Sequence, residues 1–273
     1  MKLLTLNSHS WMEENQKEKI KILAEAIKEL DYDVVALQEV NQSLSKKLVW
    51  SNVREDNFSV LLLDELEKLG CSGYNMCWEF SHLCYGTYEE GISIITKHKI
   101  LEEDISRFWI STSRDINVPK TRRGIRIPIE IEGEMIDFYS CHMGWWNDQE
   151  ESFKGQADKL LSTMDKDRLA FFMGDFNNDA FVRNEGYDYF IQKGMKDTYW
   201  MAKNRDDGIT VEGKIAGWDL NRKSLRLDWI LANKEVDVRY SKVVFNGKNK
   251  TVISDHYGVE IEVSLGGINN EKN

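Results

Sequence analysis

The sequence has only two prolines and contains no low-complexity tract. These shortages exclude a proline-rich linker and argue against a disordered arm. No apolar stretch approaches the roughly 18 residues that suggest a membrane-spanning helix, so we expect no membrane span. The apolar run at residues 3–6 is too short for a secretory signal, and we therefore expect a cytoplasmic protein.

Cysteine is also scarce, and the chain has only four: Cys71, Cys77, Cys84 and Cys141. Their spacing matches neither a zinc knuckle, which would need a C-x2-C pattern, nor a disulfide framework. We therefore expect four reduced, partly buried thiols, because unpaired cysteine behaves as a small hydrophobic residue.

Positively charged residues are outnumbered: the chain has 36 Lys and Arg but 46 Asp and Glu, which gives a net charge of −10. A protein that binds nucleic acid by neutralising phosphates usually carries a basic patch. The nearest approach to one is a short basic group: Lys120, Arg122, Arg123 and Arg126. The charge balance disfavours a nucleic-acid partner, but a bound cation can invert the local field, so a nuclease stays an alternative.

What is present fits an ordinary globular protein of 273 residues, with 41% apolar and 30% charged residues. This length suits one large domain with a substantial core. We expect a single catalytic domain over residues 1–266. The short polar end at 267–273 is predicted to be a flexible tail.

The first 40 residues read as strand, helix, strand. Residues 2–7 and 34–39 are apolar strands, and apolar residues recur at helical spacing between them from Ile20 to Leu30. Asn15 with Glu18 three residues later predicts a capping box at the start of that helix. Such a unit favours a parallel pair of strands.

A second unit of the same kind begins at Ile136 and ends at Met173, with a helix over 153–164. It follows a predicted antiparallel hairpin over 125–140, in which Pro128 suggests an edge position or a bulge. A helix is predicted over 58–69, whereas the aromatic-rich segment 74–88 reads as a loop over the sheet or a wall of a pocket. Two similar halves with hairpins attached predict an α/β (α+β) fold, a four-layer α-β-β-α sandwich of two mixed sheets.

Polar residues recur where the predicted strands end. The set comprises Asn7, Glu39, His142, Asp175, Asn177, Asp255 and His256, together with Asp228 inside its own strand. Each has an ordinary explanation alone, such as a strand-end cap or a solvated face, and His9, His82 and His98 are interpreted as ordinary surface or loop histidines. Five separate strand ends sharing this feature favour a common site. Hard oxygen donors suit Mg²⁺ or Mn²⁺ better than zinc.

Hydrolysis of a phosphoester needs charge neutralisation, an activated water and help for the leaving oxygen. Glu39 and Asp255 are candidate metal ligands, with Asn7 beside them, and Asp175 can orient or deprotonate the water. Hydrogen bonds to the phosphate are expected from Asn7, Asn177 and His142. His256 can bind or protonate the phosphate if Asp228 polarises it.

Six short motifs carry a family resemblance: Thr5-Leu6-Asn7, Leu37-Gln38-Glu39, Ser140-Cys141-His142, Gly174-Asp175-Phe176-Asn177, Arg226-Leu227-Asp228-Trp229 and Ser254-Asp255-His256. In this order they resemble the endonuclease/exonuclease/phosphatase superfamily, which includes deoxyribonucleases, abasic endonucleases, neutral sphingomyelinases and inositol polyphosphate 5-phosphatases. The resemblance implies the four-layer sandwich and a Mg²⁺-dependent phosphoesterase. His142 looks like the deoxyribonuclease and sphingomyelinase branches, whereas abasic endonucleases tend to have tyrosine there.

The sequence therefore predicts a Mg²⁺- or Mn²⁺-dependent hydrolase of a small or lipid-like phosphodiester or a phosphorylated metabolite. Arg122, Arg123 and Trp145 are candidate substrate-binding residues, although Trp145 and Trp146 could equally be packed at a strand–helix junction. One alternative is a metal-dependent nuclease. The second is a non-catalytic regulatory or binding protein that uses the same fold.

Overall fold

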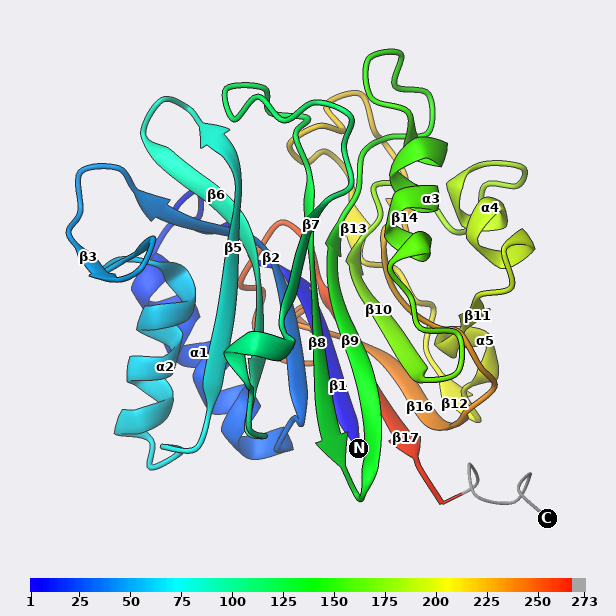
Figure 1. Ribbon diagram of the computed structural model, residues 1–273, viewed down its shortest axis with the longest axis horizontal. Helices are drawn as coiled ribbons and strands as arrows, with labels where there is room; N and C mark the ends of the chain where they lie inside the picture. The colour runs from blue at the N-terminus through cyan, green and yellow to red at the C-terminus, as the bar shows by residue number, and fades with distance from the viewer. Residues whose placement is uncertain (267–273) are drawn as a thin grey trace.

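Two large mixed β-sheets pack face to face in the computed structural model, which describes residues 1–266 (Figure 1). The predicted tail at 267–273 lies outside the described residues. The first sheet has the order β12 (Asn204–Arg205), β16 (Asp237–Val244), β17 (Gly258–Ser264), β1 (Lys2–Asn7), β2 (Val34–Ser43), β6 (Tyr88–Thr96) and β5 (Asn75–Cys84). The second has the order β11 (Lys196–Asp197), β15 (Asp228–Ala232), β10 (Leu169–Asp175), β9 (Glu134–His142), β8 (Arg123–Ile131) and β7 (Ser106–Trp109).

The remaining elements are short ribbons and helices. The ribbons pair β3 (Leu48–Trp50) with β4 (Val53–Arg54), and β13 (Val211–Glu212) with β14 (Ser224–Leu225). The α-helices of the described chain are α1 (Gln16–Leu30), α2 (Phe58–Lys68), α3 (Phe153–Ser162), α4 (Gly186–Gln192) and α5 (Thr198–Met201), and Glu102–Asp104 forms a 3-10 turn, η1. No described helix has the length and apolar character needed to cross a membrane.

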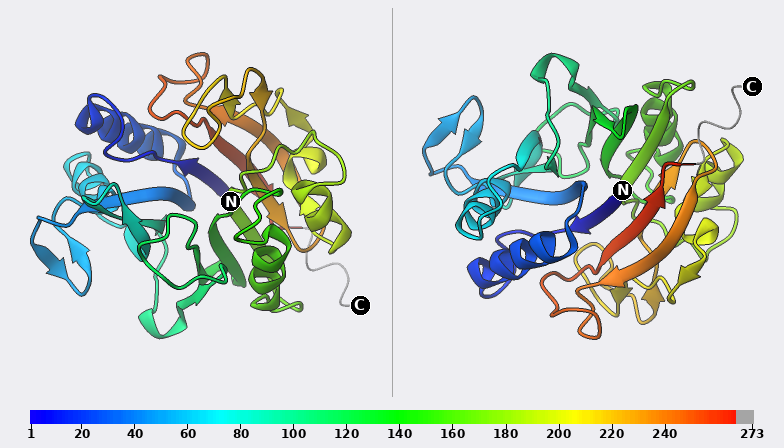
Figure 2. Two further views of the ribbon diagram at one scale, coloured as in Figure 1. Left: turned by 90° about the horizontal axis from the view of Figure 1, so that it is seen from above. Right: turned by 90° about the horizontal axis from the view of Figure 1, so that it is seen from below.

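Three apolar cores lie between the four layers. The central core joins the inner faces of the two sheets, for example Ala36 and Ile94 with Ile127 and Phe171. A second core lies between the first sheet and helices α1 and α2, and a third lies between the second sheet and helices α3 and α4. Figure 2 shows these helix pairs on opposite outer sides. The four-layer sandwich predicted from the sequence is confirmed.

Strand β10 is buried on both faces, as its unbroken apolar run predicts. Phe171 and Met173 contribute to the central core, whereas Ala170 and Phe172 contribute to the outer core under the helices. The strand pairs in parallel with β9 and antiparallel with β15. In the other sheet β1 pairs in parallel with β2. The carboxyl ends of each parallel pair therefore meet at one edge of their sheet.

The sheets are also joined by polar contacts close to that edge. Ser140 donates a hydrogen bond to the Leu37 carbonyl at 3.1 Å, and the Gln38 side-chain amide donates to Ser140 Oγ at 3.2 Å. These three residues lie one or two positions before the strand ends that the sequence singled out. The contacts fix the two pairs of strand ends relative to each other.

Two local predictions are wrong. The aromatic-rich segment 74–88 is no loop, since residues 75–84 form β5, which pairs with β6 in the first sheet. The alternative interpretation, a wall of a pocket, holds for its end, because Cys84 and Tyr85 line a cavity. The capping box also fails: Asn15 precedes α1 but adopts a left-handed conformation, with φ of 55°, and its side chain makes no capping bond. Pro128 lies beyond the last β7 partner of β8, Arg126, so the predicted edge position is confirmed.

The four cysteines are all free thiols, as expected. Cys77 and Cys141 are buried, and Cys71 and Cys84 are partly buried. Burial raises the pKa of the Cys77 thiol to about 12, which keeps it in the neutral form.

Asp33 ties the start of β2 to its neighbours. Its carboxylate accepts a hydrogen bond from the Lys2 backbone N–H at 2.7 Å and contacts His98 Nε2 at 2.9 Å. The Lys97 ammonium lies 3.3 Å away. Burial alone would raise the pKa of Asp33, but these donors outweigh it and lower the pKa below its usual value.

We expect Asp33→Asn to lower the free energy of unfolding by about 1–2 kcal/mol at pH 7, because the charged hydrogen bonds are weakened. A carboxyl with a lowered pKa in the folded state stabilises the protein above its unfolded pKa and loses that effect as the pH falls. The difference between wild type and variant should therefore narrow below about pH 5. Urea unfolding followed by tryptophan fluorescence measures this, and a difference independent of pH would contradict the assignment.

Candidate active site

The predicted strand-end residues converge on one edge of the sandwich. Asp175 ends β10, where its register partners are His142 on one side and Asp228 on the other. Asp228 begins β15, whereas the sequence placed it within the strand. Gly174 allows this arrangement, because a Cβ there would lie 1.9 Å from the Cys141 carbonyl oxygen. Any other residue at position 174 would force β9 and β10 apart.

Irregular backbone aims two further side chains at the same point. Glu39 lies in the β-bulge of β2, between Leu37 and Val40, with a left-handed φ of 50°. Asn177 follows β10 with a φ of 49°. Bulges re-aim side chains, and left-handed backbone at non-glycine residues is costly unless the surroundings enforce it. Both deviations place polar groups beside Asp175.

Three potential metal ligands, from Glu39, His142 and Asp175, come within 4.8 Å of one another. His142 Nε2 lies 3.9 Å from Glu39 Oε1 and 3.7 Å from Asp175 Oδ2. Asn7 Nδ2 donates to both carboxylates, at 2.9 Å and 3.1 Å. Its Oδ1 accepts from the His9 backbone N–H, so Asn7 faces the carboxylates as a donor, and its predicted role as a metal ligand stays a prediction.

The donor set fits a divalent cation. Within residues 1–266, neither Glu39 nor Asp175 has a Lys or Arg nitrogen within 4.0 Å. Burial raises the pKa of Asp175 to about 7, although the positive charge of His256 opposes the shift. The two carboxylates carry more negative charge than the single imidazolium of His256 balances, and hard oxygen ligands match Mg²⁺ or Mn²⁺.

His256 supplies a positive charge on the other side of Asp175. Its Nδ1 lies 2.9 Å from Asp228 Oδ2, and its Nε2 lies 3.7 Å from Asp175 Oδ2. Burial alone would lower the pKa of His256, but the two carboxylates outweigh it and raise the pKa well above the usual value. Asp228 therefore holds His256 as an imidazolium, in agreement with the predicted pairing.

His142 is the neutral histidine of the site. Burial and the nearby charge of Arg122 lower the pKa of His142 well below its usual value. Its Nδ1 faces Glu90 Oε1 at 4.0 Å, on the side away from Asp175. Burial, with the charge of Glu39, raises the pKa of Glu90 to about 7. The two histidines thus differ in charge because their neighbours differ.

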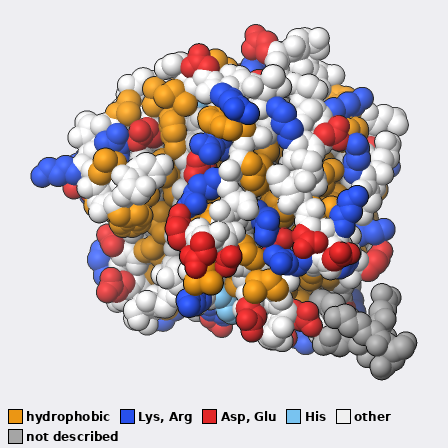
Figure 3. Space-filling model, viewed as in Figure 1, with side chains coloured by type: hydrophobic (Ala, Val, Ile, Leu, Met, Phe, Trp, Pro, Cys, Tyr) orange, Lys and Arg blue, Asp and Glu red, His pale blue; other side chains and the backbone are white. Residues whose placement is uncertain are grey.

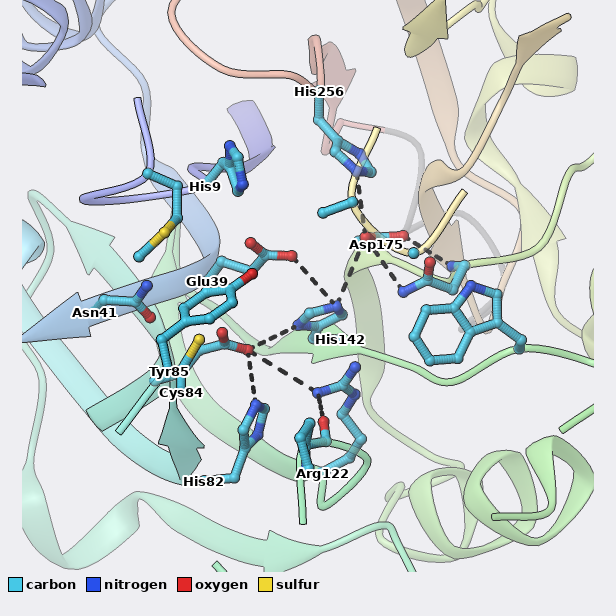
Figure 4. A pocket seen from close by; sticks show the side chains of 17 residues that line it. His9, Glu39, Asn41, His82, Cys84, Tyr85, Arg122, His142, Asp175 and His256 are labelled. Atoms are coloured by element: carbon cyan, nitrogen blue, oxygen red, sulfur yellow. Dashed lines mark hydrogen bonds and ion pairs between the residues drawn. The ribbon is translucent and has the colours of Figure 1, made fainter. Parts of the chain in front are cut away.

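A cavity of about 310 Å³ opens between these side chains (Figure 4). Of the predicted residues, those that line it are Glu39, Arg122, His142, Trp145, Asp175, Asn177 and His256. Asn7 and Asp228 are fully buried behind it. Asp255 lies in the loop before β17, with Oδ1 3.5 Å from His9 Nδ1, and its predicted role as a metal ligand stays a prediction.

Arg123 does not belong to the cavity wall, contrary to the expectation for a substrate-binding residue. It pairs with Glu79 at 2.6 Å and stacks on Trp109 at 4.3 Å. Arg122 and Arg123 point apart because they are neighbours where β8 begins. Both interpretations of the tryptophan pair hold in part, since Trp145 lines the cavity while Trp146 packs edge-on against Phe153.

Sequence reasoning missed several residues of the cavity wall. His9, His82 and Glu90 all line it. His9 lies in the loop after β1, as predicted, whereas His82 is buried within β5, so its interpretation as a surface or loop histidine is wrong. His98, in contrast, contacts only Asp33 among the acidic groups of the described chain. The missed residues lie at the bulge of β5, in β6 and after β1, where no apolar pattern marks them. The pairing of His82 with Glu90 across β5 and β6 carried no signal in the sequence.

Trp218 fixes the orientation of the Asn177 amide. Its Nε1 donates to Asn177 Oδ1 at 3.0 Å, and Asn177 Nδ2 donates to the Met143 carbonyl at 3.0 Å. Indole is only a donor and a carbonyl is only an acceptor, so the amide cannot be reversed without losing both bonds. The second hydrogen of Nδ2 is directed at Asp175 Oδ2 at 3.5 Å, a long contact that leaves it available to a closer acceptor in the cavity.

Comparison with known proteins gives a family match. The family model described as "Endonuclease/Exonuclease/phosphatase family" matches residues 11–256. A solved structure of an endonuclease/exonuclease/phosphatase family protein from Leptotrichia buccalis C-1013-b is 41% identical, with a TM-score of 0.90, and the match covers 97% of this chain and 100% of that chain. No curated protein matches.

More distant solved structures share the fold alone. The mannosyl-6-phosphatase of Bacteroides thetaiotaomicron VPI-5482 is 18% identical with a TM-score of 0.68, and the match covers 97% of this chain and 100% of that chain. Humanized D. rerio TDP2 is 14% identical with a TM-score of 0.59, and the match covers 97% and 98%.

We expect Trp218→Phe to weaken binding of inorganic phosphate by roughly fivefold, because losing one hydrogen bond costs about 1 kcal/mol and frees the Asn177 amide to turn. Isothermal titration calorimetry measures the affinity. Trp146→Phe is the matched control, since Trp146 packs on Phe153 without a bond to Asn177. Equal affinities in the two variants would show that Trp218 does not position Asn177.

Proposed function

The chain belongs to the endonuclease/exonuclease/phosphatase family, and on that premise we propose that it is a Mg²⁺- or Mn²⁺-dependent phosphoester hydrolase. We propose a small or lipid-like phosphodiester, or a phosphorylated metabolite, as its substrate. The observation that carries the proposal is the convergence of Glu39, Asp175 and His142 beside an imidazolium, His256, in one cavity. Such a site offers both a place for a cation and a charged donor for a phosphate.

Glu39 and Asp175 would hold the cation, with Asp255 and Asn7 as the further candidates. When bound, the ion would neutralise charge on the phosphate oxygens and favour ionisation of water. The amide of Asn7 already bridges the two carboxylates and holds them at a fixed separation. This contact limits the movement that the carboxylates can make.

Asp175 and His256 are the candidates for proton acceptor and hydrogen-bond donor in the reaction. Asp175, which lines the cavity beside His142 and Asn177, is the candidate acceptor for the proton of the attacking water. His256, charged through Asp228, can donate a hydrogen bond from Nε2 to a phosphate oxygen. Asn177 can donate from Nδ2 to the same group, because Trp218 and Met143 fix its orientation.

The shape of the cavity supports a small substrate over duplex DNA. A volume of about 310 Å³ is at the low end of the range of small-molecule pockets. On the face shown in Figure 3, Lys and Arg side chains are interspersed with Asp and Glu instead of forming one basic stripe. The net charge of −10 also disfavours binding to the phosphate backbone of DNA.

We expect the protein to hydrolyse bis-nitrophenyl phosphate or nitrophenyl phosphate with Mg²⁺ or Mn²⁺, and chelator to abolish the activity. Glu39→Gln should lower kcat/KM by about a hundredfold or more and remove the metal dependence of the remaining rate. Continuous release of nitrophenol measures both. Glu134→Gln, at the opposite end of β9, is the matched control and should behave as wild type.

Nucleic-acid substrates tested under the same conditions separate the alternatives. Cleavage of plasmid or abasic oligonucleotide in preference to small esters would favour the nuclease. A protein that cleaves none of these substrates with either metal would favour a non-catalytic role. A Glu39→Gln variant with an unchanged metal titration would contradict the assignment of the cation site.

A further inference from the structure

We propose that the end of the cavity beyond His142 is a subsite for hydroxyl groups, so that the substrate is a phosphate ester of a compact polyhydroxylated molecule such as a sugar. The inference rests on the proposed hydrolase function and deepens it. The subsite is formed by Arg122, Glu90 and His82, all of which line the cavity and are more than nine-tenths buried.

Arg122 is the first indication of a missing ligand. Its NH1 donates to the Pro119 carbonyl at 3.0 Å, but its buried Nε has no hydrogen-bond partner in the described chain. Glu90 Oε1 is 4.0 Å from NH1, too far for a hydrogen bond. A buried guanidinium with an unused donor carries a desolvation cost that an acceptor group on a ligand would offset.

His82 and Glu90 add two acceptors opposite this donor. His82 Nδ1 lies 3.1 Å from the Thr121 carbonyl, which can only accept, so this nitrogen carries the proton. In the neutral ring Nε2 is therefore an acceptor, and it faces Glu90 Oε1 at 3.4 Å. The raised pKa of Glu90 allows its carboxyl to share a proton with His82 Nε2, and its remaining lone pairs can accept from a donor on a ligand.

The fold holds these groups in place. His82 and Glu90 are register partners on β5 and β6, and the bulge between Phe80 and His82 turns His82 toward the cavity. Thr121, which fixes the tautomer of His82, is the residue before Arg122. The three side chains are thus coupled through one strand pair and one loop. Figure 4 shows His82 and Arg122 on the same side of His142.

His142 divides the cavity into two chemical halves. Its Nε2 faces Glu39 and Asp175, where the phosphate and cation are proposed, and its Nδ1 faces Glu90. The group that enters the second half is therefore attached to the phosphate. In an ester this group is the alcohol portion of the substrate.

Hydroxyl groups match this half better than other ligand groups. A hydroxyl both accepts and donates, so neighbouring hydroxyls can accept from Arg122 and donate to Glu90 and His82. A second phosphate or a carboxylate only accepts, and it would face the carboxylates of Glu90 and Glu39. An alkyl group would leave the buried Arg122 donor unpartnered.

Three six-carbon probes test the inference: glucose 6-phosphate, n-hexyl phosphate and fructose 1,6-bisphosphate. We measure kcat/KM for each with the full chain and Mg²⁺, and affinity by calorimetry in chelator, where no turnover occurs. Glucose 6-phosphate should exceed hexyl phosphate by about tenfold to a hundredfold in both quantities, because hydrogen bonds to buried charged groups are lost with the alkyl chain.

In Arg122→Met, the ratio of kcat/KM for glucose 6-phosphate to kcat/KM for hexyl phosphate should lie within about twofold of one. Arg123→Met is the matched control, because Arg123 pairs with Glu79 outside the cavity wall, and it should keep the wild-type preference. Glu90→Gln, which preserves shape, provides a second variant if Arg122→Met does not fold, and it should also lower the preference. Preference is a ratio, so a general loss of activity does not move it.

Equal or better use of hexyl phosphate, a preference for the bisphosphate, or an unchanged preference in Arg122→Met and Glu90→Gln would overturn the subsite. The proposed hydrolase function would survive these results if nitrophenyl esters are still cleaved. If neither the nitrophenyl esters nor any of the three probes is cleaved, the hydrolase function and the inference built on it both fail.

Discussion

Two carboxylates, Glu39 and Asp175, are held close together at the meeting point of the two sheets, and the bridging donor between them is a neutral amide, Asn7. Mutual repulsion and partial burial make this arrangement costly unless positive charge joins it. The imidazolium of His256 meets one side of Asp175, and a divalent cation would meet the other. The rest of the site follows from this need for positive charge.

The fold satisfies the constraint by combining regular sheets with a few irregular positions. Parallel pairs bring Asn7 and the β2 bulge together in one sheet, and His142 and Asp175 together in the other. The polar contacts of Ser140 then lock the two edges. Left-handed backbone occurs at several non-glycine residues, and at two of them, Glu39 and Asn177, it directs the side chain into the cavity. Function is thus concentrated where the regular pattern is interrupted.

The sequence predicted the layers, and most of the residues that it singled out lie in or behind the cavity, because both depend on signals that a single chain displays. Apolar runs define strands, and a polar residue directly after such a run stands out, as Asp175 does after Met173. His82, Glu90 and the outward turn of Arg123 depend instead on strand register and on a bulge, which join residues through pairing that no local pattern records. The aromatic residues of β5 also concealed a strand within an apparent loop.

The account depends most directly on where a divalent cation binds. Crystals soaked in Mn²⁺ and measured at the manganese absorption edge give an anomalous map that locates the ion independently of any activity. The account predicts a peak in contact with the carboxylate oxygens of Glu39 and Asp175. A second group, His9, Glu13 and Asp255, also has its potential ligand atoms within 4.8 Å of one another. A map with no peak at Glu39 and Asp175, or with its only peak at this second group, would contradict the account.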